Sequence, residues 1–276
     1  MKRLILIVVC VVTAIGVTAG AFIGYQWHVY NRSIKLDSQC SVILDDAGNS
    51  ILLFSEDGKK ALLVDTKKGK EASALSKKIN VANLTIINTH AHFDHTEGNT
   101  LYQNVPIFGG DVPREIWNSE SKGSRYPTEV LRPGEERIID IGSEKVRIRN
   151  TGRGHTSNDL IVYFEKRHLL ATGDLLFPSI HPVLFPTSGG NIAAWVQTLD
   201  SLTADTTIHR VIPGHGLPTN CNVIATQREY FTSIASTVND SQKLSVLKKK
   251  YRSYYEVPGL SSFDKTVEFL AKERNL

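Results

Sequence analysis

The chain has 276 residues, of which 41% are hydrophobic and 22% are charged, which is sufficient for one sizeable globular domain with a complete core. Its formal net charge of +4 is only mildly basic, so the charge balance gives no indication of nucleic-acid binding, and basic runs such as 248–250 are typical of a solvated helix face. The sequence has no internal repeat and no low-complexity tract, which argues against a repeat protein or a largely disordered one.

The first part of the chain has the pattern of an export signal. Lys2 and Arg3 precede an uncharged stretch over residues 4–25, which is long enough to span a bilayer because a membrane helix needs about 20 residues. The positive charge before this stretch predicts that the N-terminus stays in the cytoplasm and that the rest of the chain is periplasmic or extracellular. A cleaved signal peptide is the alternative, because Ala-Gly-Ala at 19–21 is typical of a cleavage site, and the protein would then be secreted.

These signals divide the chain into a signal anchor or signal peptide (1–25), a polar linker (26–40) and a globular domain (41–276). Cys40 and Cys221 would both lie in an oxidising compartment, where they could form a disulfide. Nothing in the sequence brings them together, so two unpaired cysteines are the favoured interpretation. The sequence does not indicate an oligomeric state.

Short apolar runs and turn signals predict a domain of mixed α/β class. Residues 50–54 and 61–65 predict two strands of a hairpin, residues 71–79 have the spacing of an amphipathic helix, and residues 84–87 predict a short buried strand. This strand–helix–strand order indicates α and β layers packed together. The remaining predicted elements, in chain order, are a polar insertion (113–133), a hairpin (137–141 and 145–149), two strands (160–164 and 168–171), a long loop (177–190), a helix (192–202), a last strand (208–212) and three amphipathic helical stripes towards the C-terminus.

After the strand at 84–87, three imidazoles and a carboxylate occur within six residues, in the run His90-Ala-His92-Phe-Asp94-His95. Zinc accepts imidazole nitrogen and carboxylate oxygen as ligands. Residues two apart in an extended segment point the same way, so His90 and His92 can bind one metal ion. Asp94 and His95 lie beyond the turn and can reach a second ion.

Three further donors occur downstream in similar surroundings. His155 lies in Gly-Arg-Gly-His-Thr, Asp174 in Ala-Thr-Gly-Asp-Leu-Leu, and His215 in Ile-Pro-Gly-His-Gly. Each follows or closes an apolar run and has Gly or Pro beside it, which is where a strand ends and a loop can direct a side chain. Open α/β sheets bind ligands at the carboxyl ends of their strands, which suits these positions.

This ordered set of motifs resembles that of the metallo-β-lactamase superfamily, and the resemblance covers roughly Cys40 to the C-terminus. It is closest to the glyoxalase-II-like branch, because the chain has both His95 and Asp174. The resemblance implies an α/β fold, a four-layer αββα sandwich, with two zinc ions per chain between the sheets at one edge; iron or manganese are alternatives. It also implies that His90, His92 and His155 bind the first ion, that Asp94, His95 and His215 bind the second, and that Asp174 bridges both.

The predicted activity is hydrolysis. Two metal ions about 3.5–4 Å apart can clamp a bridging hydroxide, because metal binding lowers the pKa of water to about 7. This hydroxide would attack a substrate carbonyl, while Asp94 orients it and passes its proton to the leaving group. Asp65, at the end of a strand, is either a partner that orients a ligand histidine or the first residue of a turn.

The residue three positions after Asp174 narrows the substrate class. In other branches of the superfamily that this chain resembles, many β-lactamases have a cysteine at the position of Asp174 and a lysine three residues later, and the quorum-signal lactonases have a tyrosine at that later position. This chain departs from both, because it has Phe177 there. We therefore expect an exported or membrane-anchored hydrolase of a small-molecule ester, thioester, lactone or amide. The alternatives are a β-lactamase, an iron-dependent oxidoreductase similar to the persulfide dioxygenases, and a non-catalytic metal-binding accessory protein.

Overall fold

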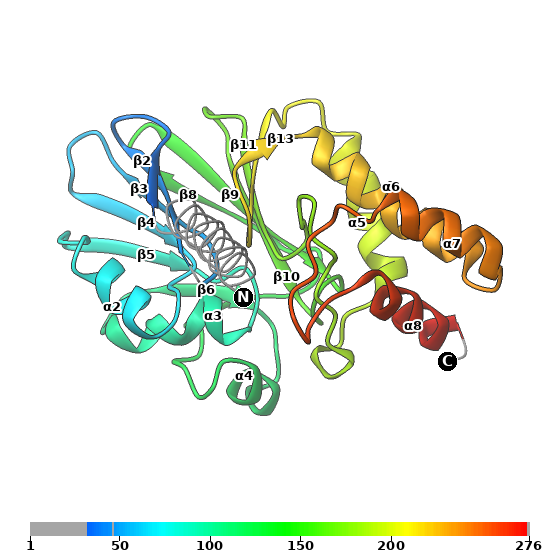
Figure 1. Cartoon of the computed structure of the whole chain (residues 1–276). Coiled ribbons are helices and arrows are strands. Elements are labelled where there is room, and N and C mark those ends of the chain that lie inside the picture. The colour runs from blue at the N-terminus through cyan, green and yellow to red at the C-terminus, as the bar shows by residue number, and fades with distance from the viewer. Residues whose placement is uncertain (1–31, 46, 275–276) are drawn as a thin grey trace, which may run out of the picture.

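Two β-sheets form the centre of the domain in a computed structural model that describes residues 32–45 and 47–274 (Figure 1). The first sheet contains, in spatial order, β1 (Arg32–Lys35), β2 (Cys40–Leu44), β3 (Ser50–Phe54), β4 (Lys60–Val64), β5 (Asn83–Ile87), β6 (Ile107–Gly110) and β7 (Glu129–Leu131). Strands β1 to β4 pair antiparallel, and β4 to β7 pair parallel. The second sheet contains, in spatial order, β13 (Thr219–Asn220), β12 (Arg210–Pro213), β11 (Leu169–Gly173), β10 (Asp159–Phe164), β9 (Glu144–Gly152) and β8 (Glu136–Ile141). In this sheet β11 and β12 pair parallel, and the other neighbours pair antiparallel.

Strand β10 shows how the second sheet is covered on both faces. Leu160, Val162 and Phe164 contribute to the core between the two sheets. Ile161 and Tyr163 alternate with them and belong to the core beneath the helices. A strand that is buried on both faces has a continuous apolar sequence, which explains why this segment lacks the alternation of a half-exposed strand.

Helices cover the outer faces of the sheets, so the domain is a mixed α/β sandwich (Figure 1). The connections of the first sheet contain α2 (Gly69–Ser76), α3 (Phe93–Thr96), the 3-10 helix η1 (Glu97–Leu101) and α4 (Arg114–Glu120). The second sheet is accompanied by the 3-10 helix η2 (Pro186–Ser188), α5 (Ile192–Thr203), α6 (Asn222–Thr237), α7 (Ser241–Lys250) and α8 (Phe263–Arg274). Trp195 and Leu199 of α5 are fully buried in the same apolar cluster as Leu170 of β11, so this helix is fixed to the sheet by its apolar face.

The structure confirms the mixed α/β class. It also confirms the strands and helices predicted between residues 50 and 112 and after residue 137, although their ends are displaced by a few residues. The polar insertion at 113–133 is more ordered than its composition suggests, because it contains α4 and β7. Trp117 of α4 is buried, and its ring packs edge-on against that of Tyr126 at a centroid distance of 5.4 Å. The insertion therefore has a small apolar centre of its own.

The first sheet begins earlier than predicted. Strand β1 lies inside the range 26–40 that the sequence predicts to be a linker, and it pairs with β2. Three of its four residues are exposed, so this edge strand has almost no apolar pattern from which it could be recognised. The predicted anchor or signal over 1–25 lies outside the described residues. Among the residues that the structure does describe, no helix has the length and apolar character needed to cross a membrane.

Candidate metal centre

The predicted donors follow the ends of strands and meet at one edge of the two sheets. His90 follows β5, and the chain then turns into α3, which carries Asp94 and His95. On the second sheet, His155 follows β9, Asp174 directly follows β11, and His215 follows β12. Both sheets therefore contribute donors to the same place.

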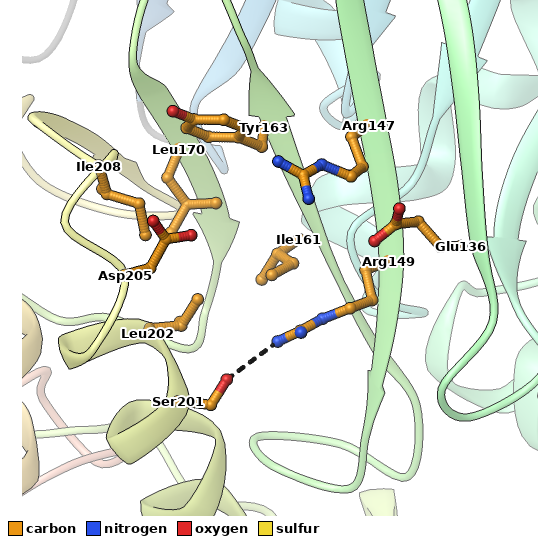
Figure 2. A pocket seen from close by; sticks show the side chains of 10 residues that line it. All are labelled: Glu136, Arg147, Arg149, Ile161, Tyr163, Leu170, Ser201, Leu202, Asp205 and Ile208. Carbon is orange, nitrogen blue, oxygen red and sulfur yellow. Dashed lines mark hydrogen bonds between the residues drawn. The ribbon is translucent and has the colours of Figure 1, made fainter.

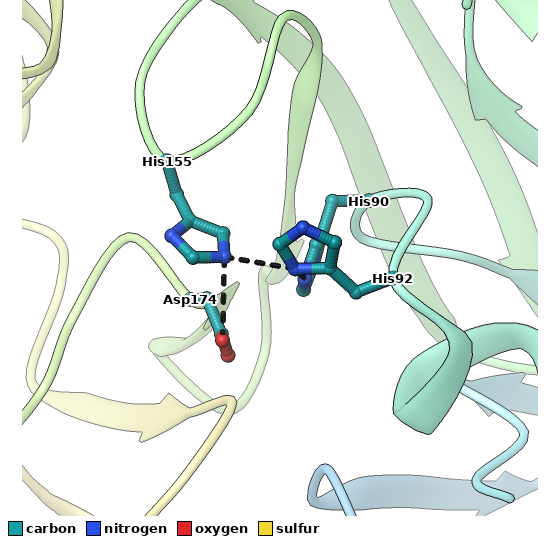
Figure 3. A group of neighbouring side chains, drawn as sticks. All are labelled: His90, His92, His155 and Asp174. Carbon is teal, nitrogen blue, oxygen red and sulfur yellow. Dashed lines mark hydrogen bonds and ion pairs between the residues drawn. The ribbon is translucent and has the colours of Figure 1, made fainter. Parts of the chain in front are cut away.

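Four of these side chains form one group, consisting of His90, His92, His155 and Asp174 (Figure 3). Nδ1 of His92 lies 3.0 Å from Nε2 of His90 and 3.0 Å from Nε2 of His155. Nε2 of His155 also lies 3.5 Å from Oδ2 of Asp174. All four residues are buried, so three imidazole nitrogens and a carboxylate oxygen face one another in surroundings shielded from water.

A second group, consisting of Asp94, His95 and His215, lies beside the first. Oδ2 of Asp94 is 3.3 Å from Nε2 of His215 and 3.9 Å from Nε2 of His95. Asp174 connects the groups, because its Oδ1 is 3.4 Å from Nε2 of His95 and its Oδ2 is 3.6 Å from Nε2 of His215. The structure thus brings together all seven residues that the sequence predicts as metal ligands.

Two donor atoms at the middle of this arrangement have no hydrogen-bond partner in the described protein. They are Nε2 of His95 and Oδ1 of Asp174, which are both buried and lie 3.4 Å apart without forming a hydrogen bond. Native proteins rarely leave a buried polar atom unpaired, because the lost interaction with water is not replaced. A divalent cation would supply the missing interaction, and imidazole with carboxylate is a donor set that zinc and iron accept. The residues therefore fit a metal centre.

Burial and charge set the protonation states of this centre. Burial and the neighbouring imidazoles hold the pKa of His90 well below its ordinary value, and burial lowers the pKa of His155 to about 3. Burial would raise the pKa of Asp94 and of Asp174, but the adjacent imidazoles hold both values below the ordinary range. Neutral imidazole and ionised carboxylate are the forms that bind metal ions, so these four side chains are prepared for ligation.

Asp65 holds His95 from the side away from the other donors. Its Oδ2 lies 2.8 Å from Nδ1 of His95 and accepts a hydrogen bond of 2.8 Å from the hydroxyl of Thr89. Burial lowers the pKa of His95, but Asp65 and the two nearby carboxylates outweigh burial and raise it well above the ordinary value. Of the two roles that the sequence leaves open, this contact favours orientation of a predicted ligand histidine. Asp65 also has a positive φ of 58°, so the chain turns at this residue as well.

The glycine before Asp174 explains how β11 ends. Gly173 has a φ of 52°, which residues with a side chain rarely adopt. A Cβ atom at this position would lie 2.5 Å from Oγ1 of Thr89. Glycine therefore permits the sharp change of direction that places the Asp174 carboxylate between the two groups.

His92 has a second set of partners that the sequence alone does not reveal. Its Nε2 lies 3.1 Å from Oγ of Ser188 and 3.3 Å from Oε2 of Glu120. The Ser188 hydroxyl in turn donates a hydrogen bond of 3.0 Å to Oε1 of Glu120. Glu120 ends α4 in the polar insertion and Ser188 ends η2 in the long loop, where a glutamate and a serine carry no recognisable signal.

The centre is open to solvent on the side of the second group. The side chains of His215 and Asp94 are 32% and 19% exposed, whereas that of His155 is fully buried. A small molecule would therefore approach along Asp94 and His215.

Phe177 packs in the interior, with its ring centroid 5.8 Å from that of His155 and 6.4 Å from that of Trp195.

Comparison with known proteins identifies metallo-β-lactamases and a probable metallo-hydrolase among the similar relatives. The metallo-β-lactamase IND-1 of Chryseobacterium indologenes is 24% identical over 173 residues, which cover 61% of this chain and 72% of the relative. A probable metallo-hydrolase of Methanocaldococcus jannaschii is 28% identical over 190 residues, which cover 62% of this chain and 88% of the relative.

Solved structures share the fold at lower sequence identity. The DIM-1 metallo-β-lactamase superposes with a TM-score of 0.61 at 20% identity, covering 72% of this chain and 96% of the other. The inverting sec-alkylsulfatase Pisa1 of a Pseudomonas species superposes with a TM-score of 0.66 at 12% identity, covering 87% of this chain and 50% of the other. The sequence pattern of the metallo-β-lactamase superfamily matches residues 43–215, a segment that contains all seven donors. Since this match covers more than half of the chain, the protein belongs to the metallo-β-lactamase superfamily.

Proposed function

We propose that this protein is a dizinc hydrolase of small molecules. The observation that supports this proposal most directly is the pair of adjacent donor groups that share Asp174. The buried, unpaired Nε2 of His95 and Oδ1 of Asp174 lie where the two groups meet. Membership of the superfamily adds support, because its members are generally metal-dependent hydrolases.

Each donor group would hold one ion. The first would be bound by His90, His92 and His155, and the second by Asp94, His95 and His215, with Asp174 shared between them. When bound, a metal pair supplies Lewis acidity and a water molecule of lowered pKa at neutral pH. The outer partners Asp65, Glu120 and Ser188 fix the orientation of the imidazoles, which is the usual role of such groups around a metal centre.

Asp94 is the candidate catalytic residue. Its carboxylate is partly exposed on the open side of the centre, and its pKa lies below the ordinary range because the neighbouring imidazoles outweigh the effect of burial. It can therefore accept a hydrogen bond from the attacking water and orient that water towards a substrate carbonyl. As the water attacks, this carboxylate can take up the proton that the water loses and then deliver it to the leaving atom.

The proposed substrates are esters, thioesters, lactones or amides. Phe177 occupies the position at which the resemblance identifies a lysine or a tyrosine in other branches, and its side chain is buried. This position therefore offers no polar group to a substrate. β-Lactams form a second candidate class, because proteins named as metallo-β-lactamases are among the similar relatives.

The first test is metal analysis of protein purified without added metal, followed by assays with esters, thioesters, lactones and β-lactams. We expect two zinc ions per chain and turnover of at least one class. His215→Ala should weaken one of the two ions selectively, so an unchanged stoichiometry and affinity would contradict the ligand assignment. About one iron per chain with sulfur-dependent oxygen uptake would instead establish the dioxygenase alternative. Metal-loaded protein that is inactive on the whole panel would favour the accessory role.

The second test addresses Asp94. Asp94→Asn keeps the shape of the side chain but removes its charge, so we expect kcat to fall about 10²-fold or more, as for loss of a general acid or base. Circular dichroism and a cooperative melt should show that the variant is folded. Activity close to that of the unchanged protein would contradict the catalytic assignment.

We also propose that the domain acts outside the cytoplasm, either anchored through residues 4–25 or released after cleavage near Ala21. The support is the charge pattern around the uncharged N-terminal stretch. Cell fractionation combined with N-terminal sequencing of the mature protein would distinguish the two forms. Recovery of uncleaved protein in the cytoplasmic fraction would contradict both.

A further inference from the structure

A polar groove lies on the outer face of the second sheet, between β9 and α5. Along β9 the side chains alternate, so Val146 and Ile148 are buried in the core between the sheets while Arg147 and Arg149 lie on the other face. Helix α5 packs on β10 and β11 through its apolar side and leaves the outer face of β9 beside it uncovered. The groove follows this boundary.

Two adjoining hollows make up the groove, and both are lined by Arg149 and Ser201. Figure 2 shows the first, into which Arg149 extends from β9 towards Ser201 of α5 and Arg147 extends towards Tyr163 of β10. The second continues towards the end of β9. Its polar lining includes the side chains of Arg149, Thr151, Arg153, Gln197, Thr198 and Ser201.

The two hollows differ in charge. The first contains the carboxylates of Glu136 and Asp205, and Arg147 forms an ion pair of 3.6 Å with Glu165. The second has no acidic residue in its lining, although it contains two guanidinium groups. Positive charge in the second hollow is therefore not balanced by the residues that form it.

The two guanidinium groups of the second hollow have spare hydrogen-bond donors. Arg149 donates to the hydroxyl of Ser201 at 3.3 Å, and Arg153 donates through Nε to the carbonyl of Gly189 at 2.9 Å. Within the described part of the chain neither group forms an ion pair with a carboxylate. The charge of Arg153 reaches Glu273, where it opposes the rise in pKa that burial causes, and the Glu273 carboxylate already accepts a hydrogen bond of 2.8 Å from the amide of Ile192.

We propose that this second hollow is a binding site for a phosphate-bearing small molecule, separate from the metal centre. A guanidinium group matches the geometry of a phosphate because two parallel N–H groups can bind two oxygens. Two such groups flank the hollow, and the side chains of Gln197 and Thr198 in its lining can provide additional neutral donors. Binding uses groups that metal ligation and hydrolysis do not require.

The test is isothermal titration of the metal-loaded full-length protein with inorganic phosphate and with pyrophosphate at constant ionic strength. We expect binding that weakens about tenfold or more in Arg149→Gln and in Arg153→Gln, because each change removes a charged hydrogen-bond donor. Arg137→Gln is the matched control, since this arginine is exposed on β8 and its guanidinium donates to the carbonyl of Glu136. The control should bind as the unchanged protein does.

A second arm separates this site from the metal centre, which can also attract phosphate. Binding at the groove should persist after chelation of the metal and in His215→Ala. Binding that disappears in either case, or that is indifferent to both arginine substitutions, would overturn the proposal, as would the absence of binding. Melting curves of both arginine variants would establish that any loss of binding occurs in folded protein.

Discussion

His92 uses both nitrogens of its ring. Nδ1 faces the other donors of the metal centre, while Nε2 faces Glu120 and Ser188. An outer carboxylate fixes the tautomer of a ligand imidazole and makes its other nitrogen a stronger donor to metal. Because Glu120 and Ser188 lie in different connections and bond to each other, they also join α4 to the long loop across His92.

Substitution of Glu120 should therefore weaken metal binding without breaking the fold. In Glu120→Gln the partner of His92 becomes neutral, and we expect the Kd for zinc to rise about tenfold or more, as for other outer-shell partners. Competition with a chromophoric chelator measures this directly and does not depend on turnover. Glu115→Gln, on the exposed side of the same helix, is the control and should leave the Kd unchanged. Equal affinities in the two variants would contradict the role of Glu120.

Gly48 lies against the imidazole of His95 and gives a second prediction about metal binding. A Cβ atom at this position would overlap the imidazole of His95, so Gly48→Ala must displace that ring. We expect loss of the second metal ion with retention of the first, measured as metal stoichiometry after dialysis.

The control for this change is Gly58→Ala. Gly58 has a φ of 68°, but a Cβ atom added there would have no other atom within 4 Å. Alanine at this position should therefore cost about 1 kcal/mol of stability and leave the metal content unchanged. Two tightly bound ions in Gly48→Ala would show that His95 does not need its observed position.

At the scale of elements, Lys67 connects the turn that follows β4 to strand β2 and to the turn between β2 and β3. Its side chain is fully buried, and its ammonium donates hydrogen bonds to the carbonyls of Ile43 (3.0 Å) and Gly48 (2.8 Å) and to the carboxylate of Asp45 (2.9 Å). Burial lowers the pKa of Lys67, which the nearby carboxylates oppose. Three acceptors satisfy the three protons of the ammonium group, so its burial is tolerated.

Lys67→Met should destabilise the domain by about 3 kcal/mol or more, because it leaves a carboxylate and two carbonyls without their partner. Urea unfolding followed by fluorescence measures this loss. Lys59→Met is the matched control, since Lys59 is 78% exposed and its ion pair with Asp57 is long, at 3.7 Å. A cost below about 1 kcal/mol in Lys67→Met would show that the connection between the two turns is not important for stability.

The elements that could be predicted are those whose own sequence has the apolar pattern of a buried strand or helix. Strands β5 and β10 are short apolar runs, and α5 has apolar residues at helical spacing, so local pattern was sufficient. Strand β1 and helix α4 could not be predicted in this way. The first is an exposed edge strand that exists because β2 offers it hydrogen-bonding groups, and the second is short and buries a single residue, Trp117.

The same distinction applies to the metal centre. The seven donors could be predicted from their local sequence. Four of them lie in the histidine-rich run that follows β5, and each of the other three lies beside Gly or Pro after an apolar run. Together they also occur in the order of motifs that the family resemblance rests on. The resemblance also predicts that these ligands converge, as they do in the structure, whereas the choice between the two roles of Asp65 required the fold to be seen. Glu120 and Ser188 were beyond prediction, because their contacts depend on how two long connections pack around His92.

At the scale of the whole molecule, the metal centre joins the two sheets. His90, His92, Asp94 and His95 extend from the first sheet, whereas His155, Asp174 and His215 extend from the second. An ion bound between them would resist separation of the sheets, in addition to the apolar core that holds them together. Metal binding should therefore stabilise the native state by mass action.

Cys40 provides a probe of this coupling. It lies on β2 in the core between the sheets with no exposed surface, and burial raises the pKa of its thiol to about 12. Cys221, at the start of α6, is half-buried, and both thiols are free in the structure. Since the thiolate is the reactive form, we expect a thiol reagent at pH 8 to modify Cys221 rapidly and Cys40 only when the sheets separate. The full-length chain with Cys10→Ser is suitable, because Cys10 is the remaining cysteine.

Removal of metal should accelerate modification of Cys40 and leave that of Cys221 nearly unchanged. If free zinc is present at about 100 times its Kd, binding stabilises the native state by about 2.7 kcal/mol, so chelation should increase the rate at Cys40 about 100-fold when opening is rapid relative to modification. Mass spectrometry of each cysteine-containing peptide over time measures both rates in one sample. Rapid modification of Cys40 in metal-loaded protein would contradict the closed inter-sheet core, and an equal rate with and without metal would contradict the coupling between the centre and the fold.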